Sequence, residues 1–291
     1  MTDRHGPPAA AERRSGASPV TPIVTLRADD GAVAEIHRHG AHVTSWRPAG
    51  DGEERLYLSG RSGFGDTAAI RGGVPVVFPQ FALDGPLPRH GFARTMAWSL
   101  GCIAREADGA ADAEFVLRDS AETRAVWDAT FKAVLAVTVI ARQLAITLRV
   151  ENTGDSAFRF TAALHTYLRV RDAADAEIIG LRGAPYRVSG DRALVTDDAD
   201  RLRVHEYVDR VYVGAPPRLE LREPDRTMII EAEGFPDAVV WNPGAERAAA
   251  IDDLDPGGER QFVCIEAAVV QTPVTLGAGR RWAGTQTLTA S

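Results

Sequence analysis

Residues 262–270 read Phe262-Val263-Cys264-Ile265-Glu266-Ala267-Ala268-Val269-Val270, a run that is apolar at almost every position. Alternate side chains of a strand point to opposite faces of its sheet, and both faces of this run are apolar. The run therefore predicts a strand that is buried on both sides. Its one charged group, Glu266, needs a specific partner or a cavity, because an unpaired buried carboxylate is costly and its pKa tends to rise.

A second β-type run carries a histidine in the same way: Leu164-His165-Thr166-Tyr167-Leu168-Arg169-Val170. If the two strands lie near each other, His165 and Glu266 can form an acid/base pair. Two plainer interpretations remain open. His165 also fits a hydrogen-bonded core histidine, and Glu266 also fits a salt-bridged or edge-strand carboxylate.

The rest of the chain predicts an all-β fold. Short apolar or alternating runs are broken repeatedly by Gly, Pro, Asp and Asn, the pattern of a sandwich or barrel. A short helix is predicted over residues 120–126. The predicted strands cover residues 23–27, 32–38, 43–46, 97–104, 114–118, 131–151 (two strands with a turn near residue 141), 158–170, 202–205, 218–221, 227–232, 238–241, 261–270 and 282–288. So many strands predict a large antiparallel β-sandwich.

No repeat or linker divides these strands, so we expect one domain over residues 21–291. Residues 1–20 are rich in Pro, Ala, Arg and Ser and have no apolar core of a signal peptide, which predicts a disordered tail. No run is as long as the roughly 18 apolar residues of a membrane span. We therefore expect a cytoplasmic protein that acts away from membranes. We also expect it to be a monomer.

Composition excludes several classes of function. Of the 291 residues, 45% are apolar and 25% charged, which is typical of a soluble globular protein. The net charge of −7 argues against a nucleic-acid-binding surface, which needs clustered cations. Lysine is nearly absent, so the cations are mostly arginines, whose planar fork suits phosphate or carboxylate. Cys102 and Cys264 are far apart and predict neither a disulfide framework nor a zinc site.

Two arginine-bearing stretches are candidates for binding an anion. In the first, Arg71 precedes the Gly72-Gly73 pair, which would let backbone approach a ligand closely. A Gly-Gly turn with a solvated arginine is the alternative.

In the second stretch, Arg89 and Arg94 bracket His90 within one loop. Neighbouring guanidinium groups repel each other unless an anion lies between them, although solvated loop arginines fit the pattern as well.

Asp209 interrupts the β-prone run Tyr207-Val208-Asp209-Arg210-Val211-Tyr212. It is a candidate acceptor for sugar or water hydroxyls, with a turn or an ion pair with Arg210 as the likelier default on sequence alone.

Metal sites and common catalytic motifs find little support. The histidines at 37, 39 and 42 have no carboxylate or cysteine at matching positions, and Gly40 predicts a turn that separates them, so we predict no metal. Asp253 and Asp255 resemble the start of a calcium loop, but Cys264 stands where the terminal Glu belongs. Nucleophile elbows, phosphate loops and dinucleotide fingerprints are missing.

Six motifs stand in order along residues 21–291: Arg71-Gly72-Gly73-Val74-Pro75 with Phe78-Pro79, Leu87-Pro88-Arg89-His90-Gly91-Phe92-Ala93-Arg94, Leu164-His165-Thr166-Tyr167, Asp209-Arg210-Val211-Tyr212, Trp241-Asn242-Pro243 and Phe262-Val263-Cys264-Ile265-Glu266-Ala267. In this combination the sequence resembles the hexose-6-phosphate mutarotases, also called glucose-6-phosphate 1-epimerases, a branch of the aldose 1-epimerase superfamily.

The resemblance implies a galactose mutarotase-like β-sandwich that binds its sugar in a groove on one sheet and needs no cofactor. It implies that His165 and Glu266 are the catalytic pair. The substrate-binding residues that it implies are Arg71, Arg89, His90, Arg94 and Asp209. At the position of Arg89 the family holds various residues, often Gln, and His90 falls where relatives place a second histidine near the sugar ring.

The implied chemistry agrees with the reading of the two strands. Opening a hemiacetal ring requires one group to take the proton of the anomeric hydroxyl and another to protonate the ring oxygen. We expect Glu266 to act as the carboxylate base and protonated His165 as the acid, with the roles exchanged on ring closure. The arginines would hold the phosphate of a hexose 6-phosphate. Two alternatives remain: an epimerase of unphosphorylated aldoses, and a carbohydrate-binding or regulatory protein without turnover.

Overall fold

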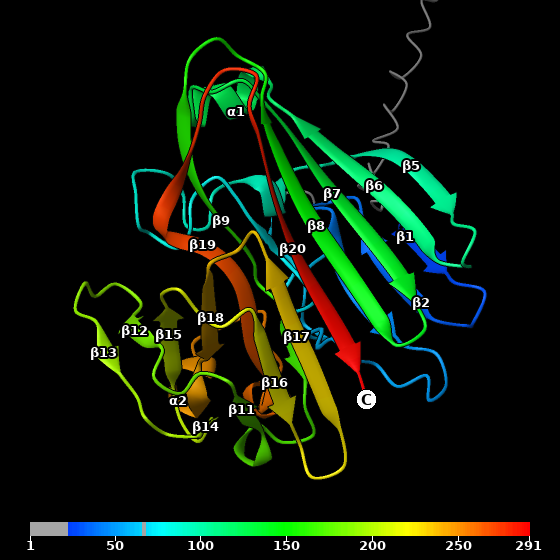
Figure 1. The fold of residues 1–291 in the computed structure, drawn as a ribbon, viewed down its shortest axis with the longest axis vertical. Coiled ribbons are helices and arrows are strands. Elements are labelled where there is room, and N and C mark those ends of the chain that lie inside the picture. Colours follow the sequence, from blue (N-terminus) through cyan, green and yellow to red (C-terminus); the bar gives the residue numbers. More distant parts are fainter. Residues whose placement is uncertain (1–22, 66–67) are drawn as a thin grey trace, which may run out of the picture.

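The computed structural model describes residues 23–65 and 68–291, and it consists almost entirely of antiparallel strands in two large sheets and one small sheet (Figure 1). The predicted tail, residues 1–20, lies outside the described residues. The small sheet has the order β1 (Ile23–Arg27), β2 (Val33–His37) and β3 (His42–Arg47). The predicted all-β antiparallel sandwich is confirmed.

The nine-stranded sheet runs diagonally across the molecule in Figure 1. Its spatial order is β14 (Arg201–Arg203), β11 (Glu177–Ile179), β16 (Arg218–Arg222), β17 (Thr227–Glu233), β20 (Arg281–Ala290), β8 (Gln143–Asn152), β7 (Phe131–Ile140), β6 (Ala111–Arg118) and β5 (Ser99–Arg105).

The eight-stranded sheet is built around β19. Its spatial order is β13 (Val195–Thr196), β12 (Pro185–Val188), β15 (Val208–Tyr212), β18 (Asp237–Asn242), β19 (Phe262–Leu276), β9 (Phe158–Leu164) and β4 (Val76–Val77), with β10 (Tyr167–Arg169) also paired to β19. The very short β4, β12 and β13, like β11 of the other sheet, were not predicted, because two to four residues give no clear alternation.

Helices are few and short. The helices are α1 (Ala121–Val126) and α2 (Gly244–Ala248), and the single 3₁₀ turns are η1 (Ala93–Thr95), η2 (Ala173–Asp175) and η3 (Gly258–Gln261). The predicted helix at 120–126 is confirmed as α1. Ser120 caps it by accepting a hydrogen bond from the Thr123 amide, while the Thr123 hydroxyl accepts one from the Ser120 amide.

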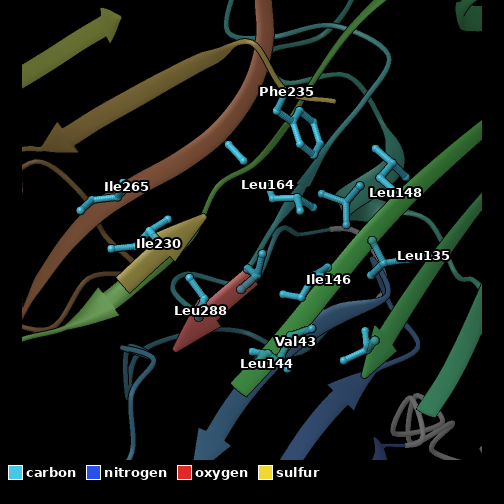
Figure 2. Close-up of a cluster of buried hydrophobic side chains, with 14 of the residues drawn as sticks. Val43, Leu135, Leu144, Ile146, Leu148, Leu164, Ile230, Phe235, Ile265 and Leu288 are labelled. Atoms are coloured by element: carbon cyan, nitrogen blue, oxygen red, sulfur yellow. The ribbon is translucent and has the colours of Figure 1, made fainter. Parts of the chain in front are cut away.

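The core fills the space between the sheets with the inward residues of each strand. Strands β7 and β8 form the predicted hairpin, and Ala141 makes the turn with a positive φ of 50°. Figure 2 shows that apolar side chains from both large sheets and from β3 meet in this core. Among them are Val43, Leu135, Ile146, Leu164, Ile265 and Leu288, all at most 1% exposed. Truncating one such side chain to alanine typically costs about 2–5 kcal/mol.

One predicted strand is interrupted at a decisive place. The sequence predicts a continuous strand over residues 158–170, but β9 ends at Leu164 and β10 begins at Tyr167. Between them, the Thr166 amide donates to the Leu164 carbonyl at 2.9 Å, so the chain turns locally. Thr166 also hydrogen-bonds to the side chain of Gln286 on β20, which is fully buried. This break places His165 outside the regular ladder, where its side chain lines a cleft.

Candidate active site

A cleft of about 200 Å³ opens on the eight-stranded sheet and contains every residue predicted for the site. The predicted residues in its lining are Arg71, Arg89, His90, Arg94, His165, Asp209 and Glu266. Residues far apart in the sequence meet there, because β15, β18 and β19 lie side by side and the β9–β10 break and two loops close over them. The clustering that the sequence predicted is therefore present in the structure.

The strand register explains why these side chains share one face. Val239 of β18 lies opposite Val211 of β15 on one side and opposite Glu266 of β19 on the other. Two residues further along, Trp241 lies opposite Asp209. Side chains two apart on a strand point to the same face, so Asp209, Trp241 and Glu266 all face the cleft.

His165 and Glu266 lie next to each other on the floor of the cleft. The Nδ1 atom of His165 lies 3.4 Å from Oε1 of Glu266, and the two residues are 8% and 2% exposed. Neither His165 Nδ1 nor Glu266 Oε2 has a hydrogen-bond partner within the described residues. Buried polar groups normally have partners, so this pair is left ready to exchange protons with a ligand.

An ion pair would lower the pKa of its carboxyl group and raise the pKa of its histidine, and burial moves both pKa values the other way. It raises the pKa of Glu266 well above its usual range, and the Asp209 carboxylate raises it further. It lowers the pKa of His165 to about 3, and the cations Arg94 and Arg71 act in the same direction. Desolvation outweighs the opposing effects, which are the charge of Arg94 on Glu266 and a backbone hydrogen bond on His165.

The cleft therefore favours a protonated Glu266 and a neutral His165. The sequence predicted the reverse, a Glu266 carboxylate with a protonated His165. The difference arises from the depth of burial and the nearby arginines, which the two strand patterns do not reveal.

Arg71 is held in place from two sides. Its Nε donates to Oδ1 of Asp253 at 3.0 Å, and its NH1 donates to the hydroxyl of Tyr167 at 3.1 Å. Although burial alone would lower it, the contacts with Tyr167 and Asp253 raise the pKa of Arg71. Arg71 is therefore a cation whose orientation is fixed.

The predicted glycine pair gives Arg71 its position. Gly73 has a φ of +58°, and a Cβ atom built there would lie 2.2 Å from the carbonyl oxygen of Val43. A side chain at this position would clash with backbone, so the Arg71 loop can pack against β3 only with glycine here. The plainer alternative, a surface turn with a solvated arginine, is not what the structure shows.

Arg94 has fewer partners than Arg71. Its NH2 donates to the Arg89 carbonyl at 3.1 Å, and its buried Nε has no partner among the described residues. Burial lowers the pKa of Arg94 to about 10, and repulsion from Arg71 and Arg89 contributes. Three guanidinium groups line one cleft, and an anion placed among them would relieve their repulsion.

Asp209 and His90 complete the polar lining. Asp209 accepts a hydrogen bond from the Tyr207 hydroxyl at 3.0 Å, and burial raises its pKa. The default interpretation, an ion pair with Arg210, is wrong, because Arg210 pairs with Asp197 at 3.0 Å. His90 lies edge-on to His165 at 5.6 Å between ring centroids, and burial lowers its pKa.

The sequence missed several residues of the lining. Trp241 meets the His165 ring edge-on at 5.7 Å, and its place in an alternating run beside Val239 could have indicated that it faces the cleft. Phe81, Ala82, Ser189, Val239 and Ile251 also line the cleft. Ser189 and Ile251 come from loops, where no periodic pattern predicts direction.

The other candidate sites have structural partners. In the part of the chain that the structure describes, no three His, Cys, Asp or Glu side chains gather to hold a metal ion. His39 and His42 donate from Nε2 to the carbonyls of Ala68 and Gly72, both at 2.7 Å. In the calcium-like stretch, Asp253 binds Arg71, and Asp255 accepts from the Gly60 amide at 2.7 Å.

The two large antiparallel sheets, with a cleft on one of them, give the chain the fold of the galactose mutarotase-like proteins. The chain belongs to the aldose 1-epimerase family, whose model matches residues 22–289. The predicted superfamily is thereby confirmed.

Two relatives agree with the predicted branch of the family. A protein of Cenchrus ciliaris named "Putative glucose-6-phosphate 1-epimerase" is 34% identical over 92% of this chain and 84% of its own length. A protein of Escherichia coli K12 with the same name is 34% identical over 81% of this chain and 79% of its own length.

Solved structures show the same fold. A crystal structure titled as a "putative mutarotase" from Salmonella typhimurium matches with a TM-score of 0.82 and 28% identity, over 89% of this chain and 87% of that one. A galactose mutarotase related enzyme from Lactobacillus acidophilus matches with a TM-score of 0.74 and 16% identity, over 93% and 97% of the two chains. Across the described residues, no helix is both long and apolar enough to cross a membrane.

Proposed function

We propose that this protein is a hexose-6-phosphate 1-epimerase that interconverts the α and β anomers of a sugar such as glucose 6-phosphate. One observation carries the proposal: a buried His165–Glu266 pair shares a cleft with Arg71, Arg89 and Arg94. The pair suits proton transfer at the anomeric centre, and the arginines suit the phosphate at the other end of the molecule. The names of the relatives support the same substrate.

The size of the cleft agrees with a single sugar ring. Its volume of about 200 Å³ is smaller than the roughly 300–1,000 Å³ of sites for drug-sized ligands. Asp209 and His90 offer polar atoms for the sugar hydroxyls, and Trp241 offers an apolar wall. These residues would hold the ring while the phosphate is anchored.

The favoured protonation states define the first step. Neutral His165 takes the proton of the O1 hydroxyl, and protonated Glu266 gives its proton to the ring oxygen O5. The C1–O5 bond breaks, and C1 becomes an aldehyde carbon. After rotation about the C1–C2 bond, the O5 hydroxyl attacks the other face of C1. Its proton returns to Glu266, and His165 protonates the carbonyl oxygen, which restores the enzyme.

This cycle uses the same pair as the mechanism expected from the sequence but begins with the proton on the other partner. General acid–base catalysis of this kind typically contributes about 10²–10⁴-fold.

Exchange NMR tests the proposal directly. The rate of α/β exchange is measured for glucose 6-phosphate, free glucose and free galactose, with purified protein and with matched samples without it. We expect acceleration that is strong for the phosphorylated sugar and weak for the others. Equal acceleration of the free sugars would instead identify an aldose epimerase, and no acceleration of any sugar would identify a binding protein.

We extend the proposal to the organisation of the protein: residues 21–291 act as one domain, as a monomer in the cytoplasm. The family match over residues 22–289 supports a single unit. The free thiols of exposed Cys102 and buried Cys264 support a reducing compartment. Size-exclusion chromatography with light scattering tests the monomer.

A further inference from the structure

Tyr167 lies behind the cleft and contacts both halves of the site. Its side chain is buried, with the residue 2% exposed, and it is not part of the cleft lining. Its hydroxyl meets Arg71, and its ring meets His165. The proposed proton transfers do not involve Tyr167.

At the hydroxyl end, Tyr167 fixes the cation of the anion site. Of the five N–H donors of a guanidinium, Arg71 gives one to Tyr167 at 3.1 Å and one to Asp253 at 3.0 Å. The Arg71 carbonyl is also held, by the Ser62 hydroxyl at 2.9 Å. Arg71 thus reaches the cleft from a fixed frame, with further donors left for an anion.

At the ring end, Tyr167 supports the imidazole of His165. The two rings are stacked with centroids 5.0 Å apart and an angle of 12° between their planes. His165 Nδ1 has no hydrogen-bond partner among the described residues, so the orientation of the ring depends on packing. The edges of Trp241 and His90 complete that packing at 5.7 and 5.6 Å.

We propose that Tyr167 is a positioning residue that links the anion site to the proton-transfer pair. An anion that binds the remaining donors of Arg71 reinforces the position that Tyr167 and Asp253 already give it, and through the Tyr167 hydroxyl it helps to hold the stacked His165 ring in its reactive orientation. The inference rests on the proposed function and deepens it: the phosphate raises kcat in addition to lowering KM. Enzymes commonly use the binding energy of a remote, non-reacting group in this way.

The test supplies the sugar and the phosphate as two separate molecules. Exchange NMR measures the α/β exchange of free glucose with the enzyme at increasing concentrations of inorganic phosphate, and enzyme-free samples correct for catalysis by phosphate itself. We expect phosphate to accelerate the wild-type enzyme. Tyr167→Phe keeps the ring and removes only the hydroxyl, so it should bind phosphate but lose about tenfold of this activation, equivalent to about 1.4 kcal/mol.

Tyr212→Phe is the matched control. The Tyr212 hydroxyl accepts from Arg210 NH1 at 3.3 Å, and Arg210 pairs with Asp197 at 3.0 Å, the same trio of residue types outside the cleft. This variant should keep the full activation. With glucose 6-phosphate, Tyr167→Phe should lower kcat about tenfold, and this loss should exceed any loss of glucose turnover without phosphate. A merely structural role would lower both equally.

A second variant keeps the inference testable if Tyr167→Phe does not fold. Arg71→Lys retains a positive charge but loses the planar fork that contacts Tyr167 and Asp253 together. It should still bind phosphate and yet lose the activation. Full activation in either variant would overturn the inference, as would a wild-type enzyme that turns over glucose 6-phosphate but ignores added phosphate. A wild-type enzyme that fails with glucose 6-phosphate would overturn the proposed function itself.

Discussion

Replacing Arg94 by methionine should make the protein more stable and the enzyme less effective. Arg94 lies in the cleft beside two other arginines, and within the described residues it pairs with no carboxylate. Its pKa falls from 12.5 to about 10, chiefly through burial. A lowered pKa of a cation means that folding disfavours the charged form, and at neutral pH that cost is fully present. Methionine has a similar length and no charge, so it removes the cost.

The expected change in the free energy of unfolding follows from the same two pKa values. At about 1.36 kcal/mol per pKa unit, the difference corresponds to an upper limit of about 3 kcal/mol. Solvent in the open cleft reduces this value, and the lost hydrogen bond to the Arg89 carbonyl costs about 0.5–1.5 kcal/mol. We therefore expect the free energy of unfolding to rise by about 1 kcal/mol. For the sugar phosphate, a lost bond to a charged group, about 1.5–3 kcal/mol, raises KM about 10- to 150-fold.

Urea unfolding gives the stability, and exchange NMR gives the kinetics. Arg159→Met, on the exposed face of β9, is the control and should change neither. The reasoning fails if Arg94→Met unfolds more easily than the wild type, because the guanidinium would then be stabilised by contacts that the charge argument omits. It fails equally if KM for glucose 6-phosphate stays the same.

Three further predictions concern the acid/base pair and the loop behind it. Glu266→Gln keeps the shape of the side chain but cannot transfer a proton, so kcat should fall about 10²–10⁴-fold with little change in KM; undiminished turnover would sink the catalytic role of Glu266. Because burial lowers the pKa of His165 to about 3, NMR of its imidazole in the unliganded protein should show the neutral ring throughout pH 5–8, and a titration inside that window would contradict the assignment. Gly73→Ala should lower the free energy of unfolding by about 1–3 kcal/mol, because it forces a side chain into a positive-φ position against Val43. Gly63→Ala, with open space around it, should change stability by less than about 0.5 kcal/mol in the same urea titration.

Much of the fold could be predicted from the sequence because strands leave a period of two in the chain. The hairpin of β7 and β8 is the clearest case, since β8 alternates over its ten residues and β7 alternates except at the buried Val134. The interruption at His165 could not be predicted, because the residues around it are as apolar as a continuous strand. At the break, Thr166 contacts Gln286 on β20, a residue 120 positions away.

The residues of the site could be predicted from the sequence better than their protonation states could. Glu266 and His165 stand out as ionisable groups in apolar runs, and the arginines stand out by their glycine neighbours. Their partners come from elsewhere: Asp253, which binds Arg71, is 182 residues away along the chain. Protonation depends on the burial and charge that these distant partners create. For that reason the sequence predicted the His165–Glu266 pair but could not fix the protonation of Glu266.

The charges that line the cleft explain why a phosphorylated sugar would suit this pair. Arg71, Arg89 and Arg94 carry three positive charges against the carboxylates of Asp209 and Asp253. Arg94 and Arg71 are also, after burial, the largest causes of the low pKa of His165. A phosphate bound among them would offset their field and raise the pKa of His165 toward neutral pH, where an imidazole is the better base. This effect acts through space and would persist without the Tyr167 hydroxyl, so the difference between wild type and Tyr167→Phe isolates the positioning contribution alone.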